Sequence, residues 1–284
     1  MASAVFDRET PPPPLDQFPP MPCLLEPAPF EGVLKLFNKL KKIWEKEEND
    51  YVSFKGITLE DFKAIDKSRD RRRLIYRFDY DEETELLVVK IPNNLHTRIR
   101  LRLYELYIRQ TDPEAWESTG STQFHAVIRG KTVRKEPDSS GMPFKRDEIY
   151  RWPTPVVQTG YSESIGSLRR DMRRWFEASK HDVKIVLLIQ WDRRRQRIVV
   201  ERWEEEEELG QAKRPVCRHV VTITREEETG GEGPVNYVVT GGCAILLPFE
   251  LLFLRQPQGA EADIVITTDD LKEWAGYCWY VARG

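Results

Sequence analysis

Four basic side chains share one face of a helix that the sequence predicts between Glu163 and Ala178. Apolar residues recur at helical spacing along the other face of this segment. The apolar set is Ile165, Leu168, Met172, Trp175 and Phe176, and the basic set is Arg169, Arg170, Arg173 and Lys180. Cations aligned in this way can contact the phosphates of a nucleic acid. An ordinary solvated face is the alternative, and it stays open.

A second group of candidates surrounds a short acidic segment. Glu136 and Asp138 stand two residues apart, so in an extended chain their side chains point to the same side. His125 lies on the strand predicted before them, and a histidine can act as a general base near neutral pH. The four histidines are otherwise too scattered to form a metal motif. Motifs of serine hydrolases, phosphate-binding loops and dinucleotide-binding folds are absent from the sequence.

Composition limits the class of protein. The 44 basic and 47 acidic side chains nearly cancel, so binding to nucleic acid would require a local patch. Cysteines stand far apart, at Cys23, Cys217, Cys243 and Cys278, without the spacing of a zinc site or a disulfide framework. No apolar run approaches the roughly 18 residues of a membrane span. These features favour an intracellular protein of the cytoplasm or nucleus that does not enter a membrane.

The elements predicted from periodicity fall into three parts. A proline-rich leader covers residues 1–30, and an extension with helices and a hairpin covers residues 31–93. The third part, residues 94–284, is predicted to be an α/β domain with a parallel strand–helix–strand crossover. Its elements are a helix at 95–110, a hairpin at 122–129 and 132–138, a strand at 154–160, the helix at 163–178 and a strand at 183–191. Residues 204–208 are expected to be a solvated charge block.

This order of elements coincides with short sequence motifs. They are Gly120-Ser121-Thr122, Pro137-Asp138, Trp152-Pro153-Thr154, the segment from Pro153 to Ser164, and the segment from Arg169 to Trp175. Together they resemble the PD-(D/E)XK, or restriction-endonuclease-like, superfamily, and within it a set of fungal proteins. The resemblance covers roughly residues 94–280 and implies a mixed sheet flanked by helices.

The resemblance implies Mg²⁺-dependent hydrolysis of phosphodiesters. Asp138 matches the first carboxylate and would be the metal ligand, but the second carboxylate position falls on Gln158 and the lysine position on Gly160. A carboxamide has no net charge to offset a divalent cation, and glycine offers no cation. Carboxylates that could compensate are Glu136 and Glu163, and cations that could do so are Lys135, Lys184 and Arg169.

We therefore expect a degenerate nuclease, with a site around Asp138, Gln158, His125 and Glu136, that acts mainly by binding. Nucleic acid is the expected ligand, through Arg169, Arg170 and Arg173, with Trp152 as an aromatic contact. One alternative is a metal-independent enzyme that uses the same cleft for a small molecule. Another is a protein-interaction module that uses the leader and the first helix. The sequence leaves a homodimer open.

Overall fold

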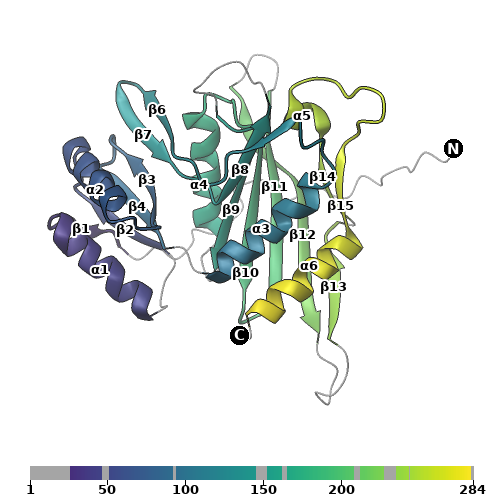
Figure 1. Ribbon diagram of the computed structural model, residues 1–284, viewed down its shortest axis with the longest axis horizontal. Helices are drawn as coiled ribbons and strands as arrows, with labels where there is room; N and C mark the ends of the chain where they lie inside the picture. The colour runs from purple at the N-terminus through teal and green to yellow at the C-terminus, as the bar shows by residue number, and fades with distance from the viewer. Residues whose placement is uncertain are drawn as a thin grey trace.

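The computed structural model describes residues 26–46, 51–91, 94–144, 152–161, 165–207, 212–226, 235–242 and 244–282. The chain is a mixed α/β protein with a six-stranded sheet, a seven-stranded sheet and a two-stranded ribbon (Figure 1). Most of the leader, Glu163, Cys23 and Cys243 lie outside the described residues. No helix in the described ranges is long and apolar enough to cross a membrane.

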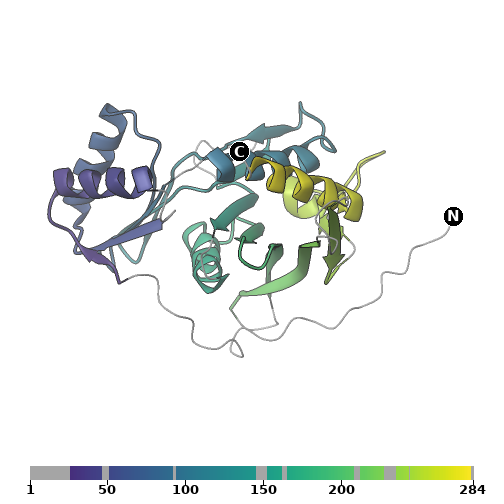
Figure 2. The same ribbon diagram turned by 90° about the horizontal axis from the view of Figure 1, so that it is seen from below.

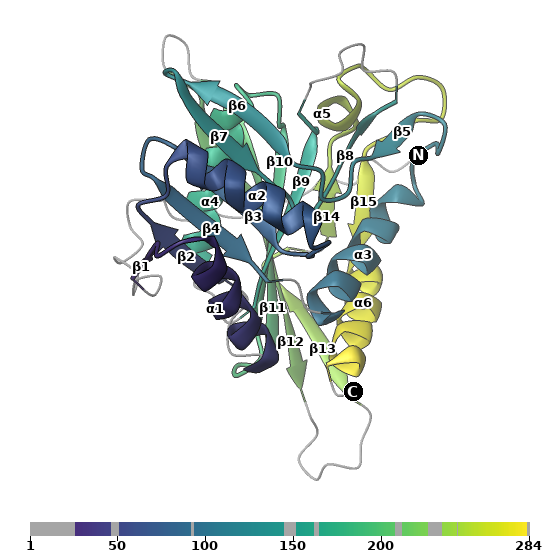
Figure 3. The same cartoon turned by 60° about the vertical axis from the view of Figure 1, so that its left-hand side comes forward.

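The six-stranded sheet has the strand order β1-β2-β4-β3-β7-β6. Its strands are β1 (Ala28–Pro29), β2 (Tyr51–Lys55), β3 (Arg77–Asp81), β4 (Leu86–Lys90), β6 (Phe124–Ile128) and β7 (Lys131–Lys135). Helices α1 (Val33–Lys46) and α2 (Leu59–Arg71) cover one face of it (Figure 3). The start of α2 is fixed by a capping box between Thr58 and Asp61.

Strand β3 shows how this sheet obtains two different faces. Phe78 and Tyr80 point toward the helices, and Phe62 of α2 stacks on Tyr80 with ring centroids 4.3 Å apart. Because side chains alternate along a strand, Asp79 and Asp81 point to the opposite face. That second face of the sheet turns toward the rest of the molecule.

The seven-stranded sheet has the order β13-β12-β11-β10-β9-β8-β5. Its strands are β5 (Trp116–Ser118), β8 (Ser139–Pro143), β9 (Pro155–Tyr161), β10 (Ile185–Asp192), β11 (Arg197–Glu206), β12 (Arg214–Glu226) and β13 (Asn236–Thr240). β9 and β10 are parallel and are joined through α4 (Ile165–Ala178), which confirms the predicted crossover. The other neighbouring strands run antiparallel.

Both faces of this sheet are covered, which explains the continuous apolar run in β10. Val186 and Leu188 pack under α4, whereas Ile185 and Leu187 pack under α3 (Asn94–Ile108) and α6 (Thr268–Val281). Figure 2 shows α4 on one side of the sheet and α3 with α6 on the other. The ribbon of β14 (Ala244–Leu247) and β15 (Ile264–Thr267), with the short helix α5 (Phe249–Phe253), completes the second layer.

Two expectations about these sheets are wrong. The hairpin β6–β7 was predicted as part of the domain at 94–284, but β7 pairs with β3 of the six-stranded sheet, so this sheet extends across the predicted boundary at residue 93. The neighbours of β9 are β8 and β10. The charge block is not fully solvated either, because β11 extends to Glu206 and buries Glu204 beside Arg202 and Arg218.

Candidate functional site

The second face of the six-stranded sheet meets β8, β9 and α4 through a buried set of charged and polar side chains. We call this set the charge cluster. It consists of Arg77, Asp79, Lys90, Lys135, Asp138, Gln158 and Asp171. Three of its members come from strands β3 and β4, so the N-terminal extension supplies much of a site that the sequence placed in the following domain.

Asp138 lies between β7 and β8, where the chain passes from one sheet to the other. Its Oδ2 accepts a hydrogen bond of 2.6 Å from the backbone N–H of Thr159, and its Oδ1 accepts one from Arg77. Arg100 of α3 donates to the backbone carbonyl of the same residue. Both carboxylate oxygens of Asp138 are therefore already engaged by donors of this chain.

Gln158 on β9 is fully buried and is held by a cation. Nζ of Lys90 donates to its Oε1 at 2.5 Å, across 68 residues of sequence. Within the described residues, Nε2 of Gln158 has no hydrogen-bond partner. A buried donor without a partner is costly, so an acceptor at this point, such as a water molecule, would stabilise the site.

Two lysines and two aspartates form the centre of the charge cluster. Nζ of Lys90 lies 3.3 Å from Asp79 and 3.7 Å from Asp171, and Nζ of Lys135 lies 3.2 Å from Asp79 and also contacts Asp171. Each lysine thus bridges the same two carboxylates. A buried charge is tolerated when it is paired and hydrogen-bonded in this way.

The pKa values of the charge cluster favour its ionised form. Burial lowers the pKa of Lys90, but Asp79, Asp171 and Asp138 more than offset burial and hold that pKa above its ordinary value. Burial raises the pKa of Asp138, and Lys90, Arg77 and the Thr159 N–H reverse this, so the pKa lies below its usual range. The pKa of Asp171 is lowered against burial in the same way, mainly by Lys135 and Lys90. All these groups are charged at neutral pH.

These residues do not fit a divalent metal ion. Asp138 is surrounded by the cations Arg77, Lys90 and Arg100, and burial together with repulsion from Arg77 lowers the pKa of Arg100 to about 10, which still leaves it charged at neutral pH. The second carboxylate position of the family motif is occupied by Gln158, whose carboxamide oxygen already accepts a hydrogen bond from Lys90. In the part of the chain that the structure describes, no three His, Cys, Asp or Glu side chains are arranged to hold a metal.

The other predicted catalytic residues lie apart from Gln158. Glu136 is buried, but its Oε1 accepts from Arg69 of α2 at 2.5 Å and from Gln123 at 2.7 Å. His125 is exposed on β6, on the face opposite to the half-buried Phe124. The predicted place of His125 in a site around Asp138 and Gln158 is therefore wrong, because β6 belongs to the other sheet and alternation turns this residue outward.

Two of the predicted binding residues are structural. The guanidinium of Arg169 makes a bidentate pair with Glu201 of β11, at 2.9 and 2.5 Å, and is largely buried. Trp152 is buried against Phe124 and Trp175, with ring centroids 5.4 and 5.7 Å apart. Our placement of both residues at a ligand surface is wrong. Arg170 and Arg173 are exposed on α4, as expected.

Four members of the charge cluster were not predicted from the sequence: Lys90, Arg77, Asp79 and Asp171. Of the cations considered as replacements for the missing lysine, only Lys135 lies in the charge cluster, whereas Lys184 donates to the carbonyl of His181. One signal was available in the sequence. The segment Arg77–Asp81 alternates charged and aromatic residues, which predicts a strand with one charged face that must be neutralised by a partner.

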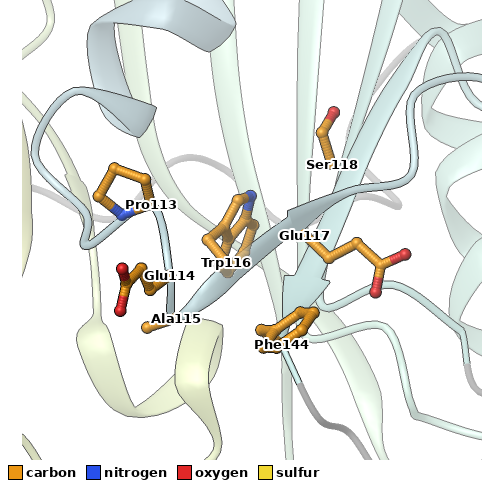
Figure 4. Close-up of a pocket in the computed structure, with 7 residues that line it drawn as sticks. All are labelled: Pro113, Glu114, Ala115, Trp116, Glu117, Ser118 and Phe144. Carbon is orange, nitrogen blue, oxygen red and sulfur yellow. The ribbon is translucent and has the colours of Figure 1, made fainter.

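A separate hollow of about 790 Å³ opens beside β5 (Figure 4). It is lined by Pro113, Glu114, Ala115, Trp116, Glu117, Ser118 and Phe144. Trp116 is largely buried and donates through Nε1 to the hydroxyl of Tyr104 at 2.9 Å. None of the predicted site residues lines this hollow.

No protein-family model matches the chain, and no curated protein matches it significantly. Its function must therefore be inferred from the geometry and chemistry of its own residues.

Proposed function

We propose that the chain is a restriction-endonuclease-like protein whose hydrolytic centre has become a structural charge cluster, and that it binds nucleic acid without cleaving it. The order of α3, β5, β8, β9, α4 and β10 supports the fold. The location of the former hydrolytic centre is supported by the positions of two residues, Asp138 just before β8 and Gln158 on β9. One observation carries the proposal. Three cations surround Asp138 at the point where a metal ion would be needed, and they are Arg77, Lys90 and Arg100.

The reaction of this fold requires a divalent cation between two carboxylates. Here a cation approaching Asp138 would be repelled by three positive groups, would find both carboxylate oxygens of Asp138 engaged by donors, and would meet the carboxamide of Gln158 at the second position. Lys90 does not act as the missing catalytic lysine, because its ammonium group interacts with Gln158, Asp79 and Asp171. Both lysines of the charge cluster are thus engaged by carboxylates of this chain and do not face a phosphate on which negative charge develops.

Exposed arginines near one end of the seven-stranded sheet can contact phosphates. α4 crosses back between two parallel strands, so its first turns lie at the same end of the sheet as the turn that follows β10. Exposed arginines occur on both segments. They are Arg170, Arg173, Arg193, Arg194 and Arg195, which we call the basic edge. Such a patch can attract nucleic acid although the net charge of the chain is −3.

Millimolar Mg²⁺ or Mn²⁺ should leave the melting temperature of the protein unchanged, because a ligand stabilises only a folded state that binds it. Thermal melts of the wild type and of Asp138→Asn, each with and without metal, measure this. Comparing the two conditions within each variant separates metal binding from any loss of stability caused by the substitution. A metal-dependent rise in the wild type that disappears in Asp138→Asn would restore the nuclease interpretation.

Reversing two charges of the basic edge should weaken binding to nucleic acid. We expect Arg170→Glu with Arg173→Glu to lower the affinity for labelled DNA or RNA by at least tenfold, and each lost phosphate contact to reduce the salt slope by about one. Fluorescence anisotropy at several salt concentrations measures both. Lys35→Glu with Lys41→Glu, at exposed positions of α1, makes the same charge change elsewhere. Equal losses in the two double variants, or no binding by the wild type at low salt, would contradict the proposal.

A further inference from the structure

A pocket of about 300 Å³ lies between the second face of the six-stranded sheet and α4. Apolar side chains from three elements form part of its wall, and they are Leu86 and Val88 of β4, Val133 of β7 and Leu168 of α4. Leu86 and Val88 are only half-buried, whereas their neighbours Leu87 and Val89 on the other face of β4 are fully buried. Part of the apolar surface of β4 therefore faces this space instead of a packed neighbour.

The buried charged groups of the pocket are paired with one another. Lys90, Lys135, Asp79 and Asp171 all line it as members of the charge cluster. Each of the two ammonium groups contacts both carboxylates, so two positive and two negative charges cancel. None of these four groups requires a charged ligand as its partner.

Two arginines complete the charged part of the lining. Arg174 is 41% exposed and pairs with Asp81 at 2.6 Å, so its charge is offset within the chain. Arg170 is exposed, so water and salt screen its charge. The pocket thus combines apolar walls with buried charges that balance.

We propose that this pocket binds a small neutral molecule with an apolar body. The body lies against Leu86, Val88 and Val133, where burial of apolar surface provides most of the binding free energy. A charged group on the ligand would lose its water without gaining a counter-ion, because the buried charges of the lining already engage one another. The inference does not depend on nucleic-acid binding.

The fluorescent probe N-phenyl-1-naphthylamine is neutral and apolar, and it can be titrated into the folded protein. We expect saturable enhancement of its fluorescence at one site. Val88→Trp, which fills the pocket, should weaken binding by about tenfold or more. Val127→Trp, at an exposed position of β6, is the matched control and should leave the affinity unchanged. Equal affinities for the two variants, or no saturable binding to the wild type, would overturn the proposal.

A competition experiment on the wild type tests the charge of the ligand and stays informative if Val88→Trp fails to fold. The competitors 1-naphthalenemethanol, naphthalene-1-sulfonate and 1-naphthylmethylammonium share one aromatic body and are neutral, anionic and cationic, respectively. We expect the neutral compound to displace the probe at a concentration at least about tenfold below that of either ion. Displacement by either ion at the same or a lower concentration would overturn the assignment of a neutral ligand.

Discussion

Replacing Lys90 by methionine should lower the free energy of unfolding by about 3–5 kcal/mol, which is typical when one partner of a buried ion pair is removed. Methionine keeps the length of the side chain but leaves Asp79 and Asp171 with less compensating charge and Gln158 Oε1 without its donor. Lys90 is 4% exposed, so water cannot replace the lost interactions without opening the two sheets. Urea denaturation followed by tryptophan fluorescence measures the change.

Lys131→Met is the matched control for this measurement. Nζ of Lys131 lies 3.4 Å from Glu82, but its side chain is 51% exposed, and such surface pairs contribute about 0–1 kcal/mol. We therefore expect a small change in this variant. A loss below about 1 kcal/mol for Lys90→Met as well would mean that the charge cluster is hydrated and does not hold the sheets together.

Replacing Glu201 by glutamine should cost about 3 kcal/mol of stability, because it removes the negative charge from a buried pair. Glu201 is 1% exposed and accepts from Arg169 through both carboxylate oxygens, and Oε2 also accepts from the indole N–H of Trp203 at 2.8 Å. Glutamine turns one of these acceptors into a donor facing other donors. Urea denaturation again provides the measurement.

Glu206→Gln tests the same chemical change at the end of the same strand. Glu206 pairs with Arg214 and Arg218 at 3.5 and 3.3 Å, but its side chain is 37% exposed, so we expect a loss below about 1 kcal/mol. Similar losses for the two variants would mean that the Arg169–Glu201 pair is not structural. Arg169 would then become a candidate for phosphate binding again.

Periodicity predicted the elements whose buried faces are regular. The apolar stripe of α4 and the apolar run of β10 were recognised because each packs along one continuous surface. Strand β8 was not recognised, since Ser139, Ser140 and Gly141 have little preference for a strand. Tertiary packing fixes this strand: a Cβ atom at Gly141 would lie 2.6 Å from the ring of Trp116.

The candidate site could be predicted only in part, because its contacts are long-range. The motif resemblance identified Asp138 and Gln158, which β8 and β9 do bring to one site. No short-range sequence pattern indicates that Arg77 contacts Asp138, 61 residues later, or that Lys90 contacts Gln158. The position of β6–β7 decides which sheet carries Lys135, and strand pairing of this kind cannot be read from side-chain alternation.

The pairing of β7 with β3 also determines how the protein can be made. The chain builds β1 to β4, leaves for α3 and β5, and returns to the first sheet with β6 and β7. During synthesis from the N-terminus, this sheet therefore cannot be completed until Lys135 has emerged from the ribosome. Until then the second edge of β3 has no partner, and Asp79 lacks one of its two lysines. The seven-stranded sheet still needs β8 to β13, so the six-stranded sheet can have all of its strands before the charge cluster gains Gln158 and Asp171.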